Sequence, residues 1–372
     1  MPEIQGITFP LELVDLVIDH SFDDHEILKI CSLVSLECVR RSRLHLFHTV
    51  ALRNTRSIQT LVELLESPLS TIACAIRCLS VDVGPHFDFV RGQAETYTPY
   101  LTRLNNTCTI ESLQFVSDRS DFRNLEFEIF LSPWACFKSV QFLTFGPVRT
   151  SPAMRGFIAS FPILRELEMD NTFWRPTAAG KLAGWKQSPP SAHLQAVRLS
   201  RCASQAVLKW LLPESPQAAT CSLLELCGIH DHTVLSIAKF LDACGPVLQH
   251  LSLSRIIRLS TQAIPLDFSC NTNLRYLRIE PQDFLEALPQ LLCSLTSASL
   301  EQIELVKPVR RTLQHLDPHN AERWANVDHH FLQPQFSRLL ITVHLHQAFE
   351  EEIIRGYLPL CAARRIMSCV LG

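Results

Sequence analysis

The chain has 372 residues, of which 47% are hydrophobic and 19% are charged, and its formal net charge at pH 7 is -3. The length allows about two ordinary domains, and the apolar content excludes extended disorder as the main state. The weak negative charge, with Lys and Arg scattered along the chain, excludes the electrostatic pattern expected for a nucleic-acid partner.

Targeting signals and cysteine usage favour an intracellular protein. The segment Met1–Gly6 has no basic stretch followed by an apolar run, so we expect no secretory signal. No apolar stretch approaches the ~18 residues of a spanning helix, so we expect no membrane partner. The 14 cysteines are spread along the chain, and several occupy apolar pattern positions, where free thiols pack as small hydrophobes. We therefore expect reduced thiols and a cytoplasmic or nuclear location.

The first 55 residues predict a small all-α unit. The segment Phe9–Leu13 begins an amphipathic run in which Leu13, Val14, Val17 and Ile18 share one face, and Asp23-Asp24 begins a second run. A basic stretch, Arg40–Arg43, leads into the last apolar residues of the unit. Ser57 is expected to cap a further helix. We place the domain boundary near residues 52–57, with a small helical unit over 1–55 and a repeat domain over 56–372.

Several segments of this unit resemble, in order, the F-box of proteins abundant in mushroom-forming (basidiomycete) fungi. The matching segments are Phe9–Leu13, Val17–His20, Asp23–Asp24, Leu28, Cys31–Val34 and Ser42–Phe47. The resemblance covers about 45 residues. It implies that the helices bind the Skp adaptor of a Skp–cullin–F-box ubiquitin ligase. The adaptor contacts that it implies are Pro10, Leu11, Glu12, Leu13, Ile18, Leu33 and Val34.

One position departs from the family pattern. The family continues Leu-Val with Cys-Arg-x-Trp, whereas Leu33-Val34 is followed here by Ser35-Leu36-Glu37-Cys38. A thiol thus stands where the family has a buried aromatic side chain. Such a replacement costs on the order of 3 kcal/mol if nothing refills the space. The departure puts adaptor affinity in question.

A six-residue apolar frame recurs along the remainder of the chain. It reads apolar, two variable residues, apolar, one variable residue, apolar. The middle apolar residues are Leu79, Leu113, Leu143, Leu167, Val197, Leu224, Leu251, Leu277, Ile303 and Leu339. The steps from Leu167 to Ile303 are 30, 27, 27, 26 and 26 residues, close to the period of leucine-rich repeats.

The frame predicts one strand per repeat, because its last two apolar residues are two apart. Helical patterns lie between the frames, and one of them, over residues 234–241, is followed by Gly245-Pro246 as a C-terminal stop. We therefore expect an α/β leucine-rich-repeat solenoid, horseshoe-like, with irregular terminal repeats. Single repeats cannot bury their apolar faces, so neighbours must stack.

Strand residues that alternate with the buried positions should line the concave face and bind a partner protein. The same residues also fit a solvated sheet face with no partner. The candidates are Glu166, Glu168, Asp170, Arg198, Glu225, His250, Tyr276, Arg278 and Glu280.

Metal and catalytic sites have little support. The histidine pairs at 230 and 232, 329 and 330, and 344 and 346 lack the third and fourth ligands that zinc needs, and no Cys-x-x-Cys accompanies them. The chain has no nucleophile elbow and no glycine-rich phosphate loop. We expect no cofactor, no metal and no enzymatic activity.

The combination predicts the substrate-recognition subunit of a Skp–cullin–F-box ubiquitin ligase. In this interpretation the helices bind the adaptor, and through it the cullin, while the repeats bind an unidentified target protein. The alternative is a non-catalytic leucine-rich-repeat interaction scaffold without ligase coupling, which Cys38 at the tryptophan position favours.

Overall fold

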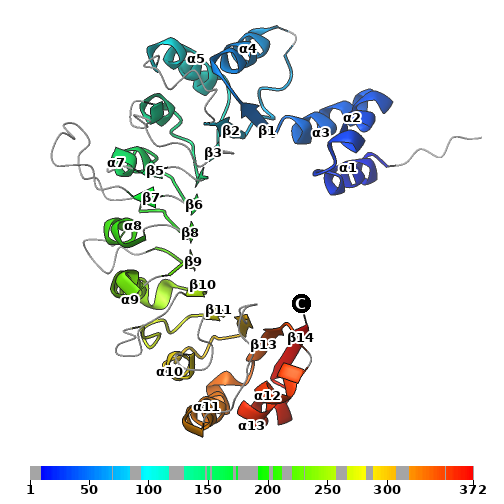
Figure 1. Ribbon diagram of the computed structural model, residues 1–372. Helices are drawn as coiled ribbons and strands as arrows, with labels where there is room; N and C mark the ends of the chain where they lie inside the picture. Colours follow the sequence, from blue (N-terminus) through cyan, green and yellow to red (C-terminus); the bar gives the residue numbers. More distant parts are fainter. Residues whose placement is uncertain are drawn as a thin grey trace, which may run out of the picture. The chain divides into compact units, whose positions relative to one another are not determined.

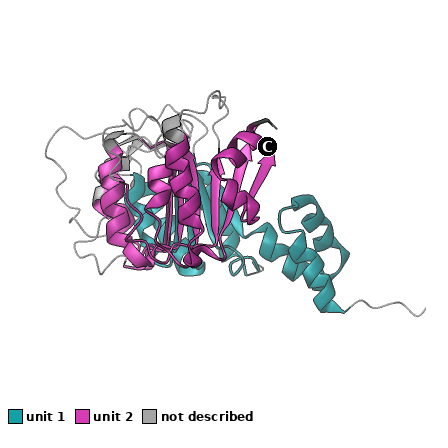
Figure 2. Ribbon diagram, turned by 90° about the horizontal axis from the view of Figure 1, so that it is seen from below, with its two compact units in different colours: residues 1–146 teal, residues 147–372 magenta. Residues whose placement is uncertain are grey.

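A computed structural model describes the chain. The described residues are 10–68, 70–83, 94–116, 130–146, 149–150, 153–170, 173–174, 192–200, 204–211, 220–229, 231–256, 266–281, 288–306, 318–347 and 349–371. They belong to two compact units, unit 1 over residues 1–146 and unit 2 over residues 147–372 (Figure 2). This division falls inside the predicted repeat region, and the boundary predicted near residue 55 remains a prediction.

Unit 1 begins with three helices around a small core. The helices are α1 (Leu11–His20), α2 (His25–Val34) and α3 (Leu36–Leu46). The Asp24 carboxylate accepts two backbone N–H groups of the first turn of α2, and Ser35 Oγ accepts the Cys38 N–H of α3. Ile18, Leu28 and Cys38 form the core, one residue from each helix. The predicted all-α character is confirmed over residues 11–46, and the helical run predicted to begin at Asp23-Asp24 is α2, with Asp24 as its N-cap.

Parallel strands follow in unit 1. Those among the described residues are β1 (Thr49–Leu52), β2 (Cys78–Asp82), β3 (Ser112–Val116) and β4 (Phe142–Phe145). Each pairs with the next, and the frame residues Leu79, Leu113 and Leu143 lie side by side in the register. The connecting segments include α4 (Thr55–Glu66), α5 (Ala94–Thr107) and the 3-10 turn η2 (Ser132–Cys136).

Two local predictions for the start of unit 1 are wrong. Strand β1 lies inside the range predicted to be helical, and it pairs with β2 through Val50 and Leu79. Ser57 is not the N-cap of α4: Asn54 caps this helix by accepting the Ser57 N–H at 2.8 Å. Ser57 Oγ accepts the Asn54 N–H and donates to the Asn54 carbonyl oxygen, which completes a capping box three residues earlier than predicted.

Unit 2 continues the strand repeat, and the strands can be followed by their labels in Figure 1. The strands of its parallel sheet are β6 (Glu166–Asp170), β8 (Ala196–Ser200), β9 (Leu223–Cys227), β10 (His250–Ile256), β11 (Tyr276–Pro281), β12 (Gln302–Val306), β13 (Leu340–Leu345) and β14 (Met367–Leu371). A separate pair consists of β5 (Arg149–Thr150) and β7 (Phe173–Trp174).

The register of this sheet aligns the apolar frame residues in one buried row. Leu167, Val197, Leu224, Leu251, Leu277 and Ile303 are consecutive partners in the row. All of them are buried, so each strand contributes one face to a continuous core. Each residue of the row pairs with the equivalent residue of the next repeat, and the paired strands are parallel. This arrangement establishes the α/β leucine-rich-repeat solenoid predicted from the frame.

At β13 the predicted position of the frame differs from the observed register by two residues. Leu339 was predicted to occupy the row, but the residue paired with Ile303 is Ile341. Leu339 lies before the strand, after the 3-10 turn η5 (Pro334–Phe336). The last strand, β14, follows no predicted frame, and it pairs with β13 through Ile341 and Met367.

Helices connect the strands of unit 2 and lie on one side of its sheet (Figure 1). They are α7 (Ala153–Ala159), α8 (Ser204–Leu211), α9 (Asp231–Cys244), α10 (Leu288–Cys293), α11 (Pro318–Phe331), α12 (Phe349–Tyr357) and α13 (Pro359–Ala363). Helix α9 ends as predicted, because Gly245 adopts a φ of 45° that favours glycine and opens the turn η4 (Gly245–Val247).

Candidate interaction surfaces

The three N-terminal helices expose most of the residues predicted to contact an adaptor. Leu33 and Val34 end α2 and are 86% and 72% exposed, and Leu11 and Leu13 of α1 are about half exposed. Pro10 and Glu12 are also exposed. Ile18 is the exception: it is 1% exposed and belongs to the core that holds the helices together. Ile18 therefore lies behind the exposed residues, and the other six of the seven predicted contacts are exposed.

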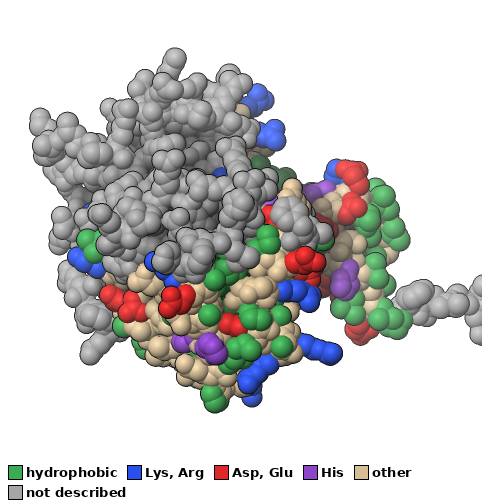
Figure 3. All heavy atoms as spheres, turned by 60° about the horizontal axis from the view of Figure 1, so that its bottom comes forward, with side chains coloured by type: hydrophobic (Ala, Val, Ile, Leu, Met, Phe, Trp, Pro, Cys, Tyr) green, Lys and Arg blue, Asp and Glu red, His purple; other side chains and the backbone are tan. Residues whose placement is uncertain are grey.

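The exposed apolar residues of this unit outnumber the buried ones. Ten large hydrophobic side chains of α1–α3 and their connections are exposed, against the three of the core. The exposed set is Leu11, Leu13, Leu16, Val17, Phe22, Ile27, Ile30, Leu33, Val34 and Leu36. Figure 3 shows hydrophobic side chains gathered over these helices. We call this set the apolar helix surface. Contiguous exposed apolar patches in folded proteins mark interaction sites.

An open apolar groove of about 610 Å³ lies within this unit, beside Cys38. Its lining residues are Leu13, Val14, Leu16, Val17, Ile18, His20, Cys31, Val34 and Cys38. Cys38 is 8% exposed, and its Sγ lies 3.2 Å from Ser35 Oγ at the start of α3. The sequence predicted missing volume at this position, because a thiol replaces an aromatic side chain. Cys38 is thus both a member of the small core and a lining residue of this groove.

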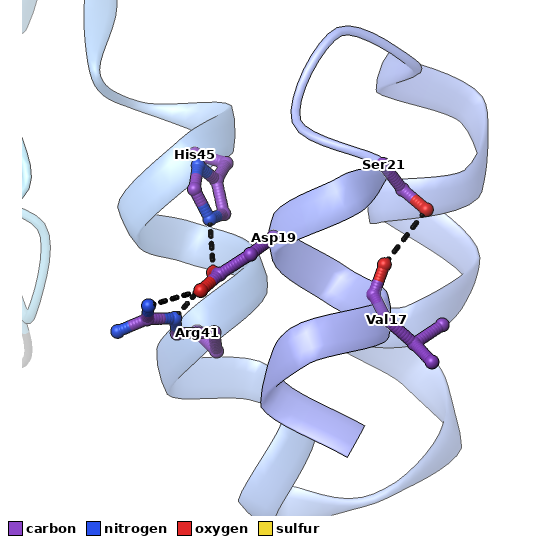
Figure 4. A network of polar contacts seen from close by, with 5 residues as sticks. All are labelled: Val17, Asp19, Ser21, Arg41 and His45. Atoms are coloured by element: carbon purple, nitrogen blue, oxygen red, sulfur yellow. Dashed lines mark hydrogen bonds and ion pairs between the residues drawn. The ribbon is translucent and has the colours of Figure 1, made fainter. Parts of the chain in front are cut away.

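An ion-pair network fixes α1 against α3 (Figure 4). The Asp19 carboxylate accepts hydrogen bonds from Arg41 Nε at 2.6 Å and from Arg41 Nη2, and it lies 2.8 Å from His45 Nε2. These hydrogen bonds, first from Arg41 and then from His45, hold the pKa of Asp19 well below its usual range. The network positions α1, whose exposed residues form much of the apolar helix surface. The basic stretch Arg40–Arg43 is thus partly structural.

We expect Asp19→Asn to lower the free energy of unfolding of the chain by about 1 kcal/mol, because a bidentate but partly solvated ion pair is lost. The folded pKa of Asp19 lies below its unfolded value of about 3.9. The contribution is therefore fully present above that value and is lost as the pH falls through the folded pKa. Urea denaturation from pH 7 downward should show a difference between the proteins that shrinks below about pH 4.

The matched control is Asp23→Asn, which changes an exposed carboxylate of the same unit. This variant should unfold like the wild-type chain at neutral pH. A loss of stability for Asp19→Asn that persists unchanged at low pH would contradict the electrostatic origin of the contribution.

The open face of the unit 2 sheet is the side opposite the connecting helices, where strand residues alternate with the buried row. All nine predicted concave-face residues lie on it, in β6, β8, β9, β10 and β11. Arg198 lies opposite Glu168 and Glu225 in the register. Its Nη1 is 2.6 Å from Glu166 Oε2 and its Nε is 3.6 Å from Glu225 Oε2. Burial lowers the pKa of Arg198, but these carboxylates outweigh burial and the net shift is upward.

A second polar group on the open face centres on Glu304 of β12. Tyr276 Oη donates to Glu304 Oε2 at 2.7 Å, and Gln302 Nε2 donates to Glu304 Oε1 at 2.9 Å. Arg278 Nη1 lies 3.8 Å from the same carboxylate, and the His250 ring is 6.0 Å from the Tyr276 ring. Burial, and then Glu304, raises the pKa of Tyr276 to about 12. Glu304 and Gln302 were not predicted, although both occupy variable positions of the frame.

All of the predicted open-face residues except Glu280 therefore fall into two groups. Arg198 connects Glu166 and Glu225, with exposed Glu168 and Asp170 beside them on β6. The second group, around Glu304, contains Tyr276 and Arg278. Glu280 lies half-buried near the end of β11. The first group is predominantly anionic and the second is mixed in charge.

Comparisons with known proteins give a weak match. No family model matches the chain, and no curated protein matches it. Among solved structures, the chain is similar to one from "Crystal structure of TLR13-ssRNA13 complex", with 13% sequence identity and a TM-score of 0.32. The match covers 82% of this chain and 48% of that chain, so this chain spans about half its length. The strand register alone establishes the repeat fold.

Among the described residues, His, Cys, Asp and Glu side chains form no group of three or more that could hold a metal ion. His330 Nε2 lies 2.8 Å from the Leu295 carbonyl oxygen. His230 lies outside the described residues. Within the described ranges, no helix combines the length and apolar character needed to cross a bilayer.

Proposed function

We propose that the chain is a substrate-recognition subunit of a Skp–cullin–F-box ubiquitin ligase. In this proposal the apolar helix surface binds a Skp-type adaptor, and the open face of the repeats binds a target protein. The chain would then act without catalysis of its own, by raising the effective concentration of the target near the ubiquitin-charged enzyme.

The observation that carries the proposal is the apolar helix surface. Leu33 and Val34 occupy the last turn of α2, where they are almost fully exposed instead of packing on the core. Full burial of such a side chain is worth about 1.5–3 kcal/mol, so a partner that covers several of them gains substantial binding energy. The ordered F-box resemblance of the same helices supports an adaptor as this partner.

The test is co-purification of the full chain with a Skp adaptor. We expect the wild-type chain to retain the adaptor and the Pro10→Ala/Leu11→Ala double variant to lose it, with affinity reduced at least about tenfold. Both side chains are exposed and neither belongs to the core, so the double variant should remain folded. Circular dichroism of each protein checks this point.

The matched control is Leu64→Ala/Leu235→Ala. These leucines are 49% and 57% exposed but lie in α4 and α9, away from the apolar helix surface. The control should bind the adaptor like the wild-type chain. A folded wild-type chain that binds no adaptor would refute ligase coupling.

The alternative is an interaction scaffold without ligase coupling. The specific observation that favours it is the groove beside Cys38, since the family places an aromatic side chain at this position. In the scaffold the open face still binds a partner, and the apolar helix surface binds a protein other than an adaptor. Absence of adaptor binding, with retained binding of other proteins by the repeats, distinguishes the two functions.

A further inference from the structure

The outer edge of β14 carries backbone hydrogen-bonding groups that no strand of the described residues pairs with. On its inner side, Ile341 N–H of β13 donates to the Ile366 carbonyl at 2.6 Å, in register with Met367. In a parallel pair, backbone groups alternate between the two sides of a strand. The groups of Ser368 and Val370 therefore face β13, whereas those of Met367, Cys369 and Leu371 face outward. Among the described residues, no strand pairs with this outer side.

The buried rows of unit 2 continue to this edge, where their last residues are more exposed than those of β13. Met367, Cys369 and Leu371 continue the rows of Ile341, Val343 and Leu345, which are at most 1% exposed. Leu371 is nevertheless 56% exposed, and Met367 and Cys369 are only partly buried. Natural edge strands are usually protected by charged residues, proline or a bulge. The sequence of β14, Met-Ser-Cys-Val-Leu, contains neither charge nor proline, and its register with β13 is continuous.

We infer that a second copy of this chain pairs with β14, antiparallel, about a twofold axis at Cys369. The outward-facing residues are symmetric about this position, because Met367 and Leu371 are each two residues from it. Cys369 then lies opposite Cys369 of the second copy, and Met367 lies opposite Leu371. Each such pair exchanges both of its backbone hydrogen bonds.

The strand is its own complement, which is why a second copy fits this edge. Every outward donor of one β14 meets an outward acceptor of the other, and the absence of charge in the strand removes like-charge repulsion across the pair. The pairing is isologous, so it closes at two copies and does not propagate. The buried apolar side of one sheet then continues into that of the second copy, and each copy covers the exposed Leu371 of the other.

Sedimentation velocity of the full chain tests the dimer. The expected mass is twice the 42.2 kDa of a single chain. Cys369→Pro removes the central outward N–H and blocks the edge, but it leaves the bonds to β13 intact because residue 369 does not donate to them. This variant should sediment as a monomer with an unchanged circular dichroism spectrum. Cys369→Ala keeps the N–H and should remain dimeric.

Three results would overturn the inference. They are a wild-type monomer at every concentration, a wild-type chain that grows beyond two copies, and a dimer that survives Cys369→Pro. If the proline variant loses its folded spectrum, Leu371→Lys replaces it, since that side chain is already more than half exposed. A folded Leu371→Lys monomer supports the dimer through β14, and a folded Leu371→Lys dimer excludes it.

Discussion

Phe115→Ala is expected to lower the free energy of unfolding of unit 1 by about 4 kcal/mol. Phe115 is fully buried in β3. Its ring stacks on Phe145 at 5.3 Å and meets the edges of Phe130 and Trp134 at 6.0 and 5.8 Å. Removing the ring leaves a cavity among three aromatic side chains that cannot collapse easily. Urea denaturation followed by circular dichroism measures the loss.

Phe142→Ala is the matched control for this prediction. Phe142 lies in the neighbouring strand β4, but its side chain is 38% exposed and alternates with the buried positions. The same substitution there should cost less than about 1 kcal/mol. Equal losses for the two variants would contradict the assignment of Phe115 to the core of unit 1.

Asp328→Ala is expected to destabilise the C-terminal end of unit 2 by about 3 kcal/mol. Asp328 of α11 is 2% exposed, and its carboxylate accepts the N–H groups of Leu360 and Cys361, each at 2.8 Å. It thus caps α13 from a different helix. Its removal leaves two donors of the first turn without their acceptor. Hydrogen exchange of peptides that cover residues 358–371 should accelerate.

Two further variants define the Asp328 effect. Asp328→Asn keeps one oxygen acceptor and should lose about half as much stability as the alanine variant. Asp242→Ala removes an exposed carboxylate from α9 and should leave the exchange of residues 358–371 unchanged. Protection of α13 that is the same in Asp328→Ala as in the wild-type chain would show that the cap contributes nothing.

The strands were predictable because their signal is local. Two buried residues two positions apart, such as Leu251 and Leu253, suffice to define a half-buried strand. At β13 this signal is ambiguous, since Leu339, Ile341 and Val343 are spaced two apart; the six-residue frame favours the register centred on Leu339, because position 338 is an arginine. Pairing with Ile303 of β12 decides between them, and this pairing is not encoded within the segment. The four-residue strand β1 buries only Leu52, which is too little for a pattern.

The positions that stabilise the candidate surfaces were less predictable. Asp19 meets Arg41 and His45, which lie 22 and 26 residues away, and Asp328 meets the start of α13 more than 30 residues away. A pattern within a short segment of sequence cannot predict partners that are this far apart. The sequence also did not show which apolar residues of α1 are buried and which are exposed, because apolar residues occur around most of this helix. Ile18 faces the core while the adjacent Val17 is 62% exposed.

Adaptor binding by α1 and α2 is the claim that hydrogen exchange, measured with and without a Skp-type adaptor, can decide. In the complex, peptides covering Leu11–His20 and His25–Val34 should exchange more slowly, while peptides covering the strands β8 to β12 should be unchanged. Protection confined to the repeats, or no change anywhere with saturating adaptor, would contradict the claim.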